Sequence, residues 1–502
     1  MLPLRGVTAA LCLLAANMDA QGASRQGDTL VLSLPALVGA ALRNNTDLRV
    51  AALNPRIAES DMMAARAIVD PSLTLGSDLG TSANDVFGVS THATQSTLDN
   101  SATVLALLPT GNQLSFSVRN SRLASDPLYR TSAAPFATNH VSTLGVSFTQ
   151  PLLRGLGRTA TMGNADAAAI SVDAAQSRYE RAADITVAQV ERAYWTLRQA
   201  ESNESVLRRS VDASRTIYER NVALRDRDVA TTLDVLTSER GLATRETQLF
   251  EATRQRIDAA DRLLVIVYGE GARLKAANEA SRVRTAPDSV IVADLPSLDS
   301  AASLALAQRS DARAARRDFD ASTRRVAFTH NQRLPRLDLV ASYAYGGTSA
   351  ASRFLNFGDS TDIRNSSWTL GLSTSIFQHN DAGSAVDQRA RAEQEIARVN
   401  QVAAENVVLA DVRAAVRGLQ VEKARYLRAR QVVDLAEREY SVAQEGARLG
   451  LVTTFQLLQY EDQLSQARLL VAQARFAIED AGTLYRLALG DGRRAYLSSS
   501  LH

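Results

Sequence analysis

The pattern that comes closest to a chemical site is a short glycine-rich segment, Gly155-x-Gly157-x-x-Ala160. This spacing is typical of the loop that holds the pyrophosphate of a dinucleotide, and here it follows an expected strand and precedes an expected helix. The expected helix is far too long for a strand–helix–strand unit, however, and no parallel strand returns after it. We therefore interpret the glycines as a bend between strand and helix, and we predict no cofactor.

No other pattern predicts catalysis. The sequence contains no GxxxxGKS/T, GxSxG or HExxH motif. Its five histidines show no spacing typical of metal ligands, and the single cysteine, Cys12, completes no zinc motif. We expect no catalytic residue, no metal site and no enzymatic activity. The histidines are His92, His140, His330, His379 and His502.

The charge balance gives no reason to expect a nucleic-acid partner. The 502 residues include 56 basic and 54 acidic side chains, for a net charge of +2. No overall field therefore favours nucleic acid or an anionic membrane surface. Hydrophobic residues make up 45% of the chain but aromatic residues only 5%, which suits thin seams between long helices better than one large core.

Residues 1–22 resemble a secretory signal. Arg5 supplies the charged start, an apolar stretch follows, and Ala20 and Gly22 are small residues suited to cleavage. Cys12 lies inside this segment, so the mature chain would lack cysteine; lipid anchoring at Cys12 is the alternative, although Leu11 is a poor match for that processing. No apolar stretch of 18 residues follows residue 22, so we expect any membrane crossing to use strands.

The strongest periodicity lies near the C-terminus and predicts one long antiparallel helical hairpin over residues 384–489. Large residues recur every seven positions on both arms, mostly with alanine at the companion position, and Gly450 marks the turn. One arm carries Val412, Leu419, Tyr426, Val433 and Tyr440. The other carries Leu457, Leu464, Val471, Ile478 and Tyr485.

A weaker copy of this pattern predicts a second hairpin over about residues 161–268. The heptad positions are again mostly large and apolar, but Glu204 interrupts the first arm and Arg256 interrupts the second. The apolar positions are Val190, Leu197, Val211 and Tyr218 on one arm, and Val235, Leu242, Leu249 and Leu263 on the other.

Each half of the chain shows the order helix, strands, long helix, tip, long helix, so we predict two structural repeats. Short alternations of polar and apolar residues predict the strands. Aromatic residues in them could form girdles at a membrane interface or the cores of small soluble sheets. Residues 81–122 are extra in the first copy, and could be barrel strands or an extracellular loop. The expected organisation is a first repeat at 23–269 with strands at about 72–150, a connector at 270–297, a second repeat at 298–489 with strands at about 336–377, and a tail at 490–502.

Over essentially its whole mature length the chain resembles the TolC-type outer-membrane efflux family. The resemblance rests on an ordered set of segments rather than on one decisive motif. It implies a mainly α fold with a β-barrel part, in which a homotrimer forms an α-barrel tunnel and a twelve-stranded barrel in outer-membrane lipid. The segments are Ala41 to Asn45, Ala67 to Pro71, Thr149 to Gly157, Thr232 to Leu236 and Gly450 to Leu458.

The resemblance also implies a function and partners. The protein would be located in the cell outer membrane and extend into the periplasm. There it would be the exit duct of a tripartite efflux or type I secretion system, passively conducting substrates delivered by an inner-membrane pump and a periplasmic adaptor, or membrane fusion, protein. The alternative is a periplasmic coiled-coil adaptor or scaffold without a membrane barrel.

The two hairpin tips are the expected partner-binding sites, and the helix starts beside them are the expected pore constriction. Gln456 and Gln459 stand where the family has acidic residues, and Val452 stands where it has an arginine, so the family's gating salt bridges are not expected. The expected adaptor-docking residues are Arg227, Asp228, Val229, Arg448, Leu449, Gly450, Leu451, Val452 and Thr453. The expected constriction consists of Asp234, Gln456 and Gln459.

Overall fold

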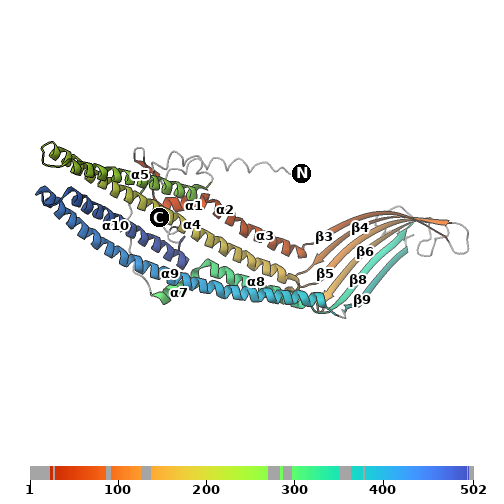
Figure 1. Cartoon of the computed structure of the whole chain (residues 1–502). Coiled ribbons are helices and arrows are strands. Elements are labelled where there is room, and N and C mark those ends of the chain that lie inside the picture. Colours follow the sequence, from red (N-terminus) through yellow and green to blue (C-terminus); the bar gives the residue numbers. More distant parts are fainter. Residues whose placement is uncertain are drawn as a thin grey trace. The chain divides into compact units, whose positions relative to one another are not determined.

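The computed structural model divides the chain into two compact units, which are described separately (Figure 1). The first contains residues 1–55, 176–314 and 402–502, and the second contains residues 56–175 and 315–401. Within them the structure describes residues 23–26, 29–85, 92–125, 137–269, 283–286, 297–349, 363–376, 379–493 and 496. The expected signal at 1–22 with Cys12, most of the connector at 270–297 and most of the tail at 490–502 lie outside the described residues.

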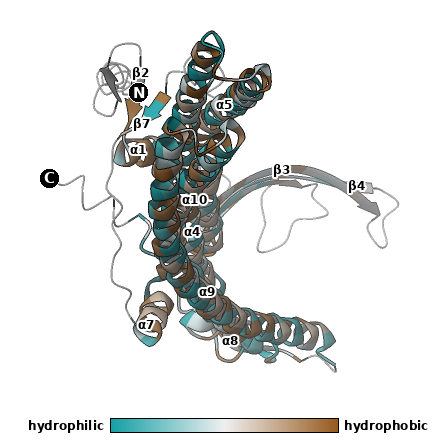
Figure 2. Ribbon diagram, turned by 60° about the vertical axis from the view of Figure 1, so that its left-hand side comes forward, coloured by the Kyte–Doolittle hydropathy of each residue, from teal (hydrophilic) through white to brown (hydrophobic). Residues whose placement is uncertain are grey.

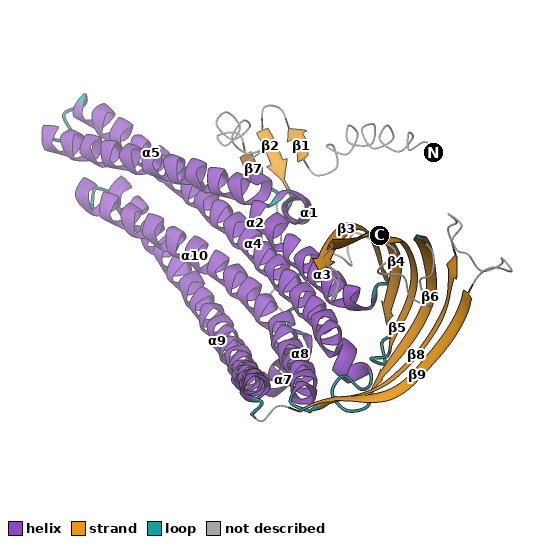
Figure 3. Cartoon of the chain, turned by 90° about the vertical axis from the view of Figure 1, so that its right-hand side faces the viewer, coloured by secondary structure: helices purple, strands orange, loops and turns teal. Residues whose placement is uncertain are grey.

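Four long helices form two antiparallel pairs. Helix α4 (Arg158–Arg225) is followed by α5 (Thr232–Tyr268), and α9 (Asp381–Arg448) by α10 (Thr454–Leu489). Figure 3 shows α5 beside α4 and α10 beside α9. Both α4 and α9 are 68 residues long. The first unit also contains the shorter helices α1 (Leu34–Asn44), α2 (Thr46–Ala51) and α7 (Leu298–Gln308).

The predicted heptad residues form the packing face of the second pair. Leu457 and Leu464 of α10 are buried, and so are the small companions Ala436 and Ala443 of α9. Small residues let two helix backbones approach closely, which is why alanine occupies the tightest positions of this seam. Figure 2 shows hydrophilic and hydrophobic residues mixed along the whole length of these helices, as expected for narrow seams.

The largest cluster of buried apolar residues lies where short elements cover the first hairpin. Val38 and Leu37 of α1 pack against Tyr194 of α4 and Leu263 of α5. A small sheet with the order β1-β2-β7 completes this region and contributes Val283 to the cluster. Its strands are β1 (Ala23–Gln26), β2 (Thr29–Leu32) and β7 (Val283–Thr285).

The second unit contains one antiparallel sheet with the order β3-β4-β5-β6-β8-β9 (Figure 3). Helix α3 (Leu53–Arg66), followed by the 3-10 helix η1 (Ala67–Val69), precedes β3, and α8 (Ser310–Gln332) precedes β8. The strands are β3 (Ser72–Asp85), β4 (His92–Leu107), β5 (Gln113–Ser125), β6 (Thr138–Pro151), β8 (Arg336–Ser349) and β9 (Ile363–Ser375).

Residues 81–122 are strands of this sheet and not one long loop. They lie almost entirely in β3, β4 and β5, with residues 86–91 outside the described part. Twelve strands from three chains would require four strands per chain, whereas this sheet has six. The period-two pattern identified strands here, but pairing between strands is non-local, so the sequence did not decide how many belong to one sheet.

The glycine-rich segment is a bend, as predicted. Gly155 and Gly157 have φ angles of 91° and 86°, a region that favours glycine, and they connect β6 to the start of α4. A long helix and an antiparallel sheet surround them, which is not the setting of a dinucleotide loop. No helix among the described residues is both long and apolar enough to cross a membrane.

Candidate functional site

The tip between α9 and α10 is a tight turn closed by a capping box. Gly450 has a φ angle of 75°, which glycine adopts without steric cost. The hydroxyl of Thr453 accepts a hydrogen bond from the Gln456 backbone N–H at 3.3 Å. In return the Gln456 amide oxygen accepts from the Thr453 backbone N–H at 3.0 Å. These bonds satisfy backbone donors that the first turn of α10 would otherwise leave without partners.

The tip between α4 and α5 repeats this construction with different residues. Asp228 has a φ angle of 57° and is the only non-glycine residue with a positive φ in the described part of the chain. The Thr231 hydroxyl accepts from the Asp234 backbone N–H at 3.1 Å, and an Asp234 carboxylate oxygen accepts from the Thr231 backbone N–H at the same distance. Aspartate tolerates this left-handed conformation better than most residues, so it replaces the glycine of the other tip.

Two of the three expected constriction residues therefore have a structural role. Asp234 and Gln456 each close a capping box at the third position of a helix, and Gln459 is exposed on α10. The hydrogen bond from the Thr231 hydroxyl lowers the pKa of Asp234 below its ordinary value. The patterns Thr-x-x-Asp and Thr-x-x-Gln are typical of capping boxes, so this role could have been predicted from the sequence. Their place in a constriction stays a prediction.

The tips expose large apolar side chains. Leu451 is 78% exposed and Leu449 67% exposed, and Val229 and Leu233 of the first tip are each 72% exposed. Exposed apolar residues gathered at a helix turn are typical of a protein-binding surface. Val452 is different: it is half-buried and packs against the cluster of Ile217, Ala443, Ala447 and Leu457, so it offers less surface to a partner than Leu449 and Leu451 do.

A groove beside the second tip extends the apolar surface. Its volume is about 520 Å³, and its lining combines apolar and charged side chains. The sequence-based set of docking residues includes Leu451 and Val452 from this groove but omits its other lining residues, which belong to the helices and not to the turn. Phe455, 62% exposed on the first turn of α10, was also omitted. The residues that line the groove include Arg438, Glu439, Val442, Gly446, Leu451 and Tyr460.

The two hairpins are tied together close to their tips. The guanidinium of Arg220 on α4 donates to the backbone oxygen of Ala447 on α9 at 2.5 Å. This carbonyl belongs to the last turn of α9, where backbone oxygens lack helical partners and a cation is favourable. The two exposed tips therefore belong to hairpins that are hydrogen-bonded to each other near their ends.

A buried ion pair connects the returning helices α5 and α10. Arg245 Nε lies 3.3 Å from Glu461 Oε2, and Arg245 Nη2 lies 2.6 Å from Asp462 Oδ1. The Ser210 hydroxyl donates to Glu461 at 2.6 Å from α4. Burial raises the pKa of Glu461, while the hydrogen bond from Ser210 and the charge of Arg245 oppose that shift. The pattern of the sequence does not indicate these partners of Glu461, because they lie on the other hairpin.

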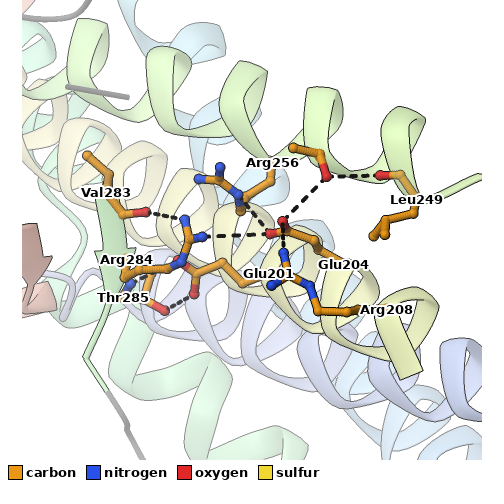
Figure 4. Close-up of polar contacts among 9 residues, drawn as sticks. Glu201, Glu204, Arg208, Leu249, Arg256, Val283, Arg284 and Thr285 are labelled. Carbon is orange, nitrogen blue, oxygen red and sulfur yellow. Dashed lines mark hydrogen bonds and ion pairs between the residues drawn. The ribbon is translucent and has the colours of Figure 1, made fainter. Parts of the chain in front are cut away.

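The two residues that interrupt the heptads of the first hairpin meet each other (Figure 4). Arg256 Nε of α5 lies 2.9 Å from Glu204 Oε2 of α4, and both side chains are buried. Arg208 donates to the other oxygen of Glu204 at 3.2 Å, and the Thr253 hydroxyl donates to it at 3.4 Å. Burial lowers the pKa of Arg256. The two residues that interrupt the heptads therefore form one polar layer in the seam between α4 and α5.

Strand β7 closes this layer from one side (Figure 4). Arg284 Nη2 lies 3.9 Å from Glu204, and the backbone N–H of Thr285 donates to Glu201 at 3.0 Å. Burial raises the pKa of Glu201, against the opposing hydrogen bonds from Thr285. Ion pairs and hydrogen bonds within the chain hold this layer, so we interpret it as a structural feature that fixes the register of α4 and α5.

Among the described residues, no group of three or more histidine, cysteine, aspartate and glutamate side chains could hold a metal ion. The surfaces that stand out are the apolar tips, the groove beside one of them and one face of the large sheet. Exposed apolar surfaces of this kind are typical of contacts with other macromolecules or with lipid.

The chain matches the family model described as outer membrane efflux protein over residues 37–267 and 301–490. No curated protein matches it. Solved structures with a similar fold include the outer-membrane channel OprN, with 19% identity, a TM-score of 0.66 and coverage of 91% of this chain and 90% of that one. The CmeC outer membrane channel of Campylobacter jejuni has 15% identity, a TM-score of 0.63 and coverage of 91% and 86%. The MtrE outer membrane channel of Neisseria gonorrhoeae has 17% identity, a TM-score of 0.61 and coverage of 91% and 89%.

Proposed function

Because the chain belongs to the outer membrane efflux protein family, we propose that it forms the outer-membrane exit duct of a tripartite efflux or type I secretion system. It conducts passively, and an inner-membrane pump supplies the substrate and the energy. The observation that carries this proposal is the six-stranded sheet with an apolar band on one face, which suits lipid, joined in sequence to two long helical hairpins. A periplasmic coiled-coil scaffold would have no use for such a face.

The proposed assembly is a homotrimer of chains that each contain two structural repeats. Exposed apolar residues on the long helices support it. On α9, Val421, Leu435 and Val442 are exposed and recur at multiples of seven residues, and on α5 Leu236 and Phe250 do the same. These are second heptad stripes, separate from the seams buried within the chain, and a second copy of the same helices is their natural partner. The helices of three chains then form an α-barrel that extends into the periplasm.

The tips are the proposed contact with a periplasmic adaptor protein. Leu451 offers the most exposed apolar side chain of the second tip, next to the groove. Leu451→Asp should abolish transport while the amount of trimer in the outer membrane stays unchanged. Leu233→Asp makes the same change on the first tip and shows whether both tips are needed. Normal transport by both variants would contradict adaptor docking at the tips.

Asp234, Gln456 and Gln459 are the proposed constriction. Gln459 is the cleanest position to test because it is exposed and takes no part in a capping box. Gln459→Glu adds one negative charge per chain, so it should raise the preference of the channel for cations in planar bilayers. An unchanged ion preference would place the constriction elsewhere.

The membrane location can be tested on two neighbouring residues of β9 that lie on opposite faces. Leu370 is on the apolar face and 63% exposed, and Thr369 is on the polar face, opposite Ser342. Arginine on a lipid-facing strand costs about 2–4 kcal/mol at the middle of the bilayer. Leu370→Arg should therefore deplete the heat-modifiable trimer from the outer-membrane fraction, whereas Thr369→Arg should not. Equal amounts of both variants there would refute a lipid-facing sheet.

A further inference from the structure

The sheet contains a complete additional hairpin. Strands β4 and β5 lie between β3 and β6, and each is paired along essentially its whole length with both neighbours. In the family resemblance each chain supplies four strands, so this hairpin either belongs to the wall of the barrel or lies outside it.

The side chains place the hairpin in the wall. Cross-strand partners share one face of a sheet, and on the same face an apolar band crosses all six strands, β4 and β5 included. Beyond this band the same face becomes polar, in the row of Ser77, Asn100, Asn120 and Ser142. The neighbouring row on the other face is small or polar throughout. One apolar row is Leu73, Val104, Phe116, Val146, Tyr343 and Trp368. The adjacent row is Thr74, Thr103, Ser117, Gly145, Ala344 and Ser367.

The turn of the hairpin is also fastened to the segment that leads into α4. The backbone N–H of Gly157 donates to the backbone oxygen of Thr110 at 2.9 Å. Gly111 has a φ angle of 94° and packs so closely that a Cβ there would lie 2.0 Å from the backbone oxygen of Gly155. A loosely attached loop would need neither contact, so the hairpin is a fixed part of the sheet.

The two edge strands of the sheet, β3 and β9, run in directions that allow β9 of one copy to pair with β3 of another. The order is antiparallel throughout and contains an even number of strands, so these edge strands run in opposite directions. In lipid, every backbone N–H and C=O group of an edge needs a partner. If β9 of each copy pairs antiparallel with β3 of the next, the backbone groups of both edge strands gain hydrogen-bond partners. Repeating the same contact around a ring of copies closes the barrel.

We propose that β9 of each chain pairs with β3 of the next, and that three chains close an eighteen-stranded barrel. This rests on the trimer of the proposed function and departs from the twelve strands implied by the family resemblance. Barrel diameter grows roughly linearly with strand number, so the circumference is about one and a half times that of a twelve-stranded barrel of equal tilt. Barrels of about 16–18 strands enclose an aqueous channel.

The face opposite the apolar one lines this channel. It is rich in serine, threonine and glycine and carries few charges within the described strands; among them, Arg119 and Asp99 form an ion pair at 3.2 Å. A lining of this kind is wettable and only weakly selective, so the outer-membrane end of the duct is not its narrow point. Selection then depends on the periplasmic tips and on the partners.

Disulfide trapping between copies tests the edge. In a Cys12→Ser background, Leu75→Cys on β3 is combined in turn with Trp368→Cys, Leu370→Cys or Leu372→Cys on β9, all on the apolar face. The matched control replaces Leu75→Cys by Phe116→Cys on β5, because β5 becomes the edge if β3 and β4 lie outside the wall. If β4 and β5 lie outside it instead, β3 remains the edge, and the number of strands in the barrel decides between the two arrangements. We expect oxidation to join neighbouring chains through β3 and β9 in at least one pair, and never through β5 and β9.

Two results of the disulfide trapping would overturn the proposal: links between β5 and β9, or no link through β3 in any pair of an intact trimer. Light scattering and membrane fractionation of the same samples distinguish failure of the eighteen-stranded barrel from failure of the proposed function. Absence of an outer-membrane trimer would refute the proposed function itself. Cryo-electron microscopy of the wild-type trimer needs no substitution. Eighteen strands in the barrel would support the proposal, and twelve would exclude it.

Discussion

The buried ion pair between α5 and α10 allows a quantitative prediction. Arg245 is 12% exposed and contacts Glu461, which is 5% exposed, and Asp462, which is 37% exposed. Arg245→Met keeps most of the side-chain volume but leaves the Glu461 carboxylate buried beside α4 without its cation. We expect the two returning helices to separate locally more often in this variant.

The expected cost is about 3 kcal/mol. Removing one partner of a buried ion pair typically costs about 3–5 kcal/mol. The value for Arg245 lies at the lower end because Ser210 still donates to Glu461 at 2.6 Å. Loss of the contact with the more exposed Asp462 adds little, since exposed pairs contribute about 0.2–1 kcal/mol. A cost of about 3 kcal/mol corresponds to about a hundredfold rise in the population of the locally open state.

Native-state hydrogen exchange measures this population directly. Amides of α5 and α10 around Arg245 and Glu461 should exchange about a hundredfold faster in Arg245→Met, provided they exchange by local opening. Arg254→Met is the matched control, because Arg254 is 61% exposed and forms ion pairs with two exposed carboxylates of its own helix, Glu251 and Asp258. It should change exchange little.

Adding Glu461→Gln to Arg245→Met should recover most of the protection, because the buried group then carries no charge. Wild-type exchange in the single Arg245→Met variant would refute the reasoning. Failure of Glu461→Gln to rescue would show that packing, and not charge burial, determines the effect.

Three further predictions concern the seams and the tips. Arg256→Leu alone should lower the free energy of unfolding, measured in urea, by about 3–5 kcal/mol, because it leaves Glu204 buried without its cation. Arg256→Leu combined with Glu204→Leu restores an apolar seam and should be neutral or stabilising. An equal loss of unfolding free energy in the single and the double variant would contradict this reasoning. Because hydrogen bonds lower the folded pKa of Asp234, its capping contribution is complete above the ordinary aspartate pKa of about 3.9 and is lost as the pH falls through the lower folded value. Hydrogen exchange at the start of α5 should accelerate in that acid range, and the start of α10, capped by Gln456, should not show this acid effect. Gly450→Ala should destabilise the second tip by about 1 kcal/mol in thermal unfolding because of its φ of 75°, and an unchanged stability would show that the turn relaxes.

Local patterns in the sequence determined the elements. The seven-residue repeat of large and small residues defined both hairpins because it only requires that two arms of one chain face each other. Alternation of polar and apolar residues marked the strands, and Gly155 and Gly157 marked the bend into α4. The exposed tips followed from the same periodicity, since a turn between two long helices has little to pack against.

Contacts between distant segments were decided only by the tertiary structure. Glu204 and Arg256 looked like two separate defects because their pairing depends on the register of one arm against the other. Arg245 and Glu461 form an ion pair although they belong to different hairpins. Val452 packs inward because Gly446, which has no side chain, leaves room for it. The number of strands in the sheet was likewise undetermined, because strand pairing is set by partners far away in the chain and a period-two pattern does not name them.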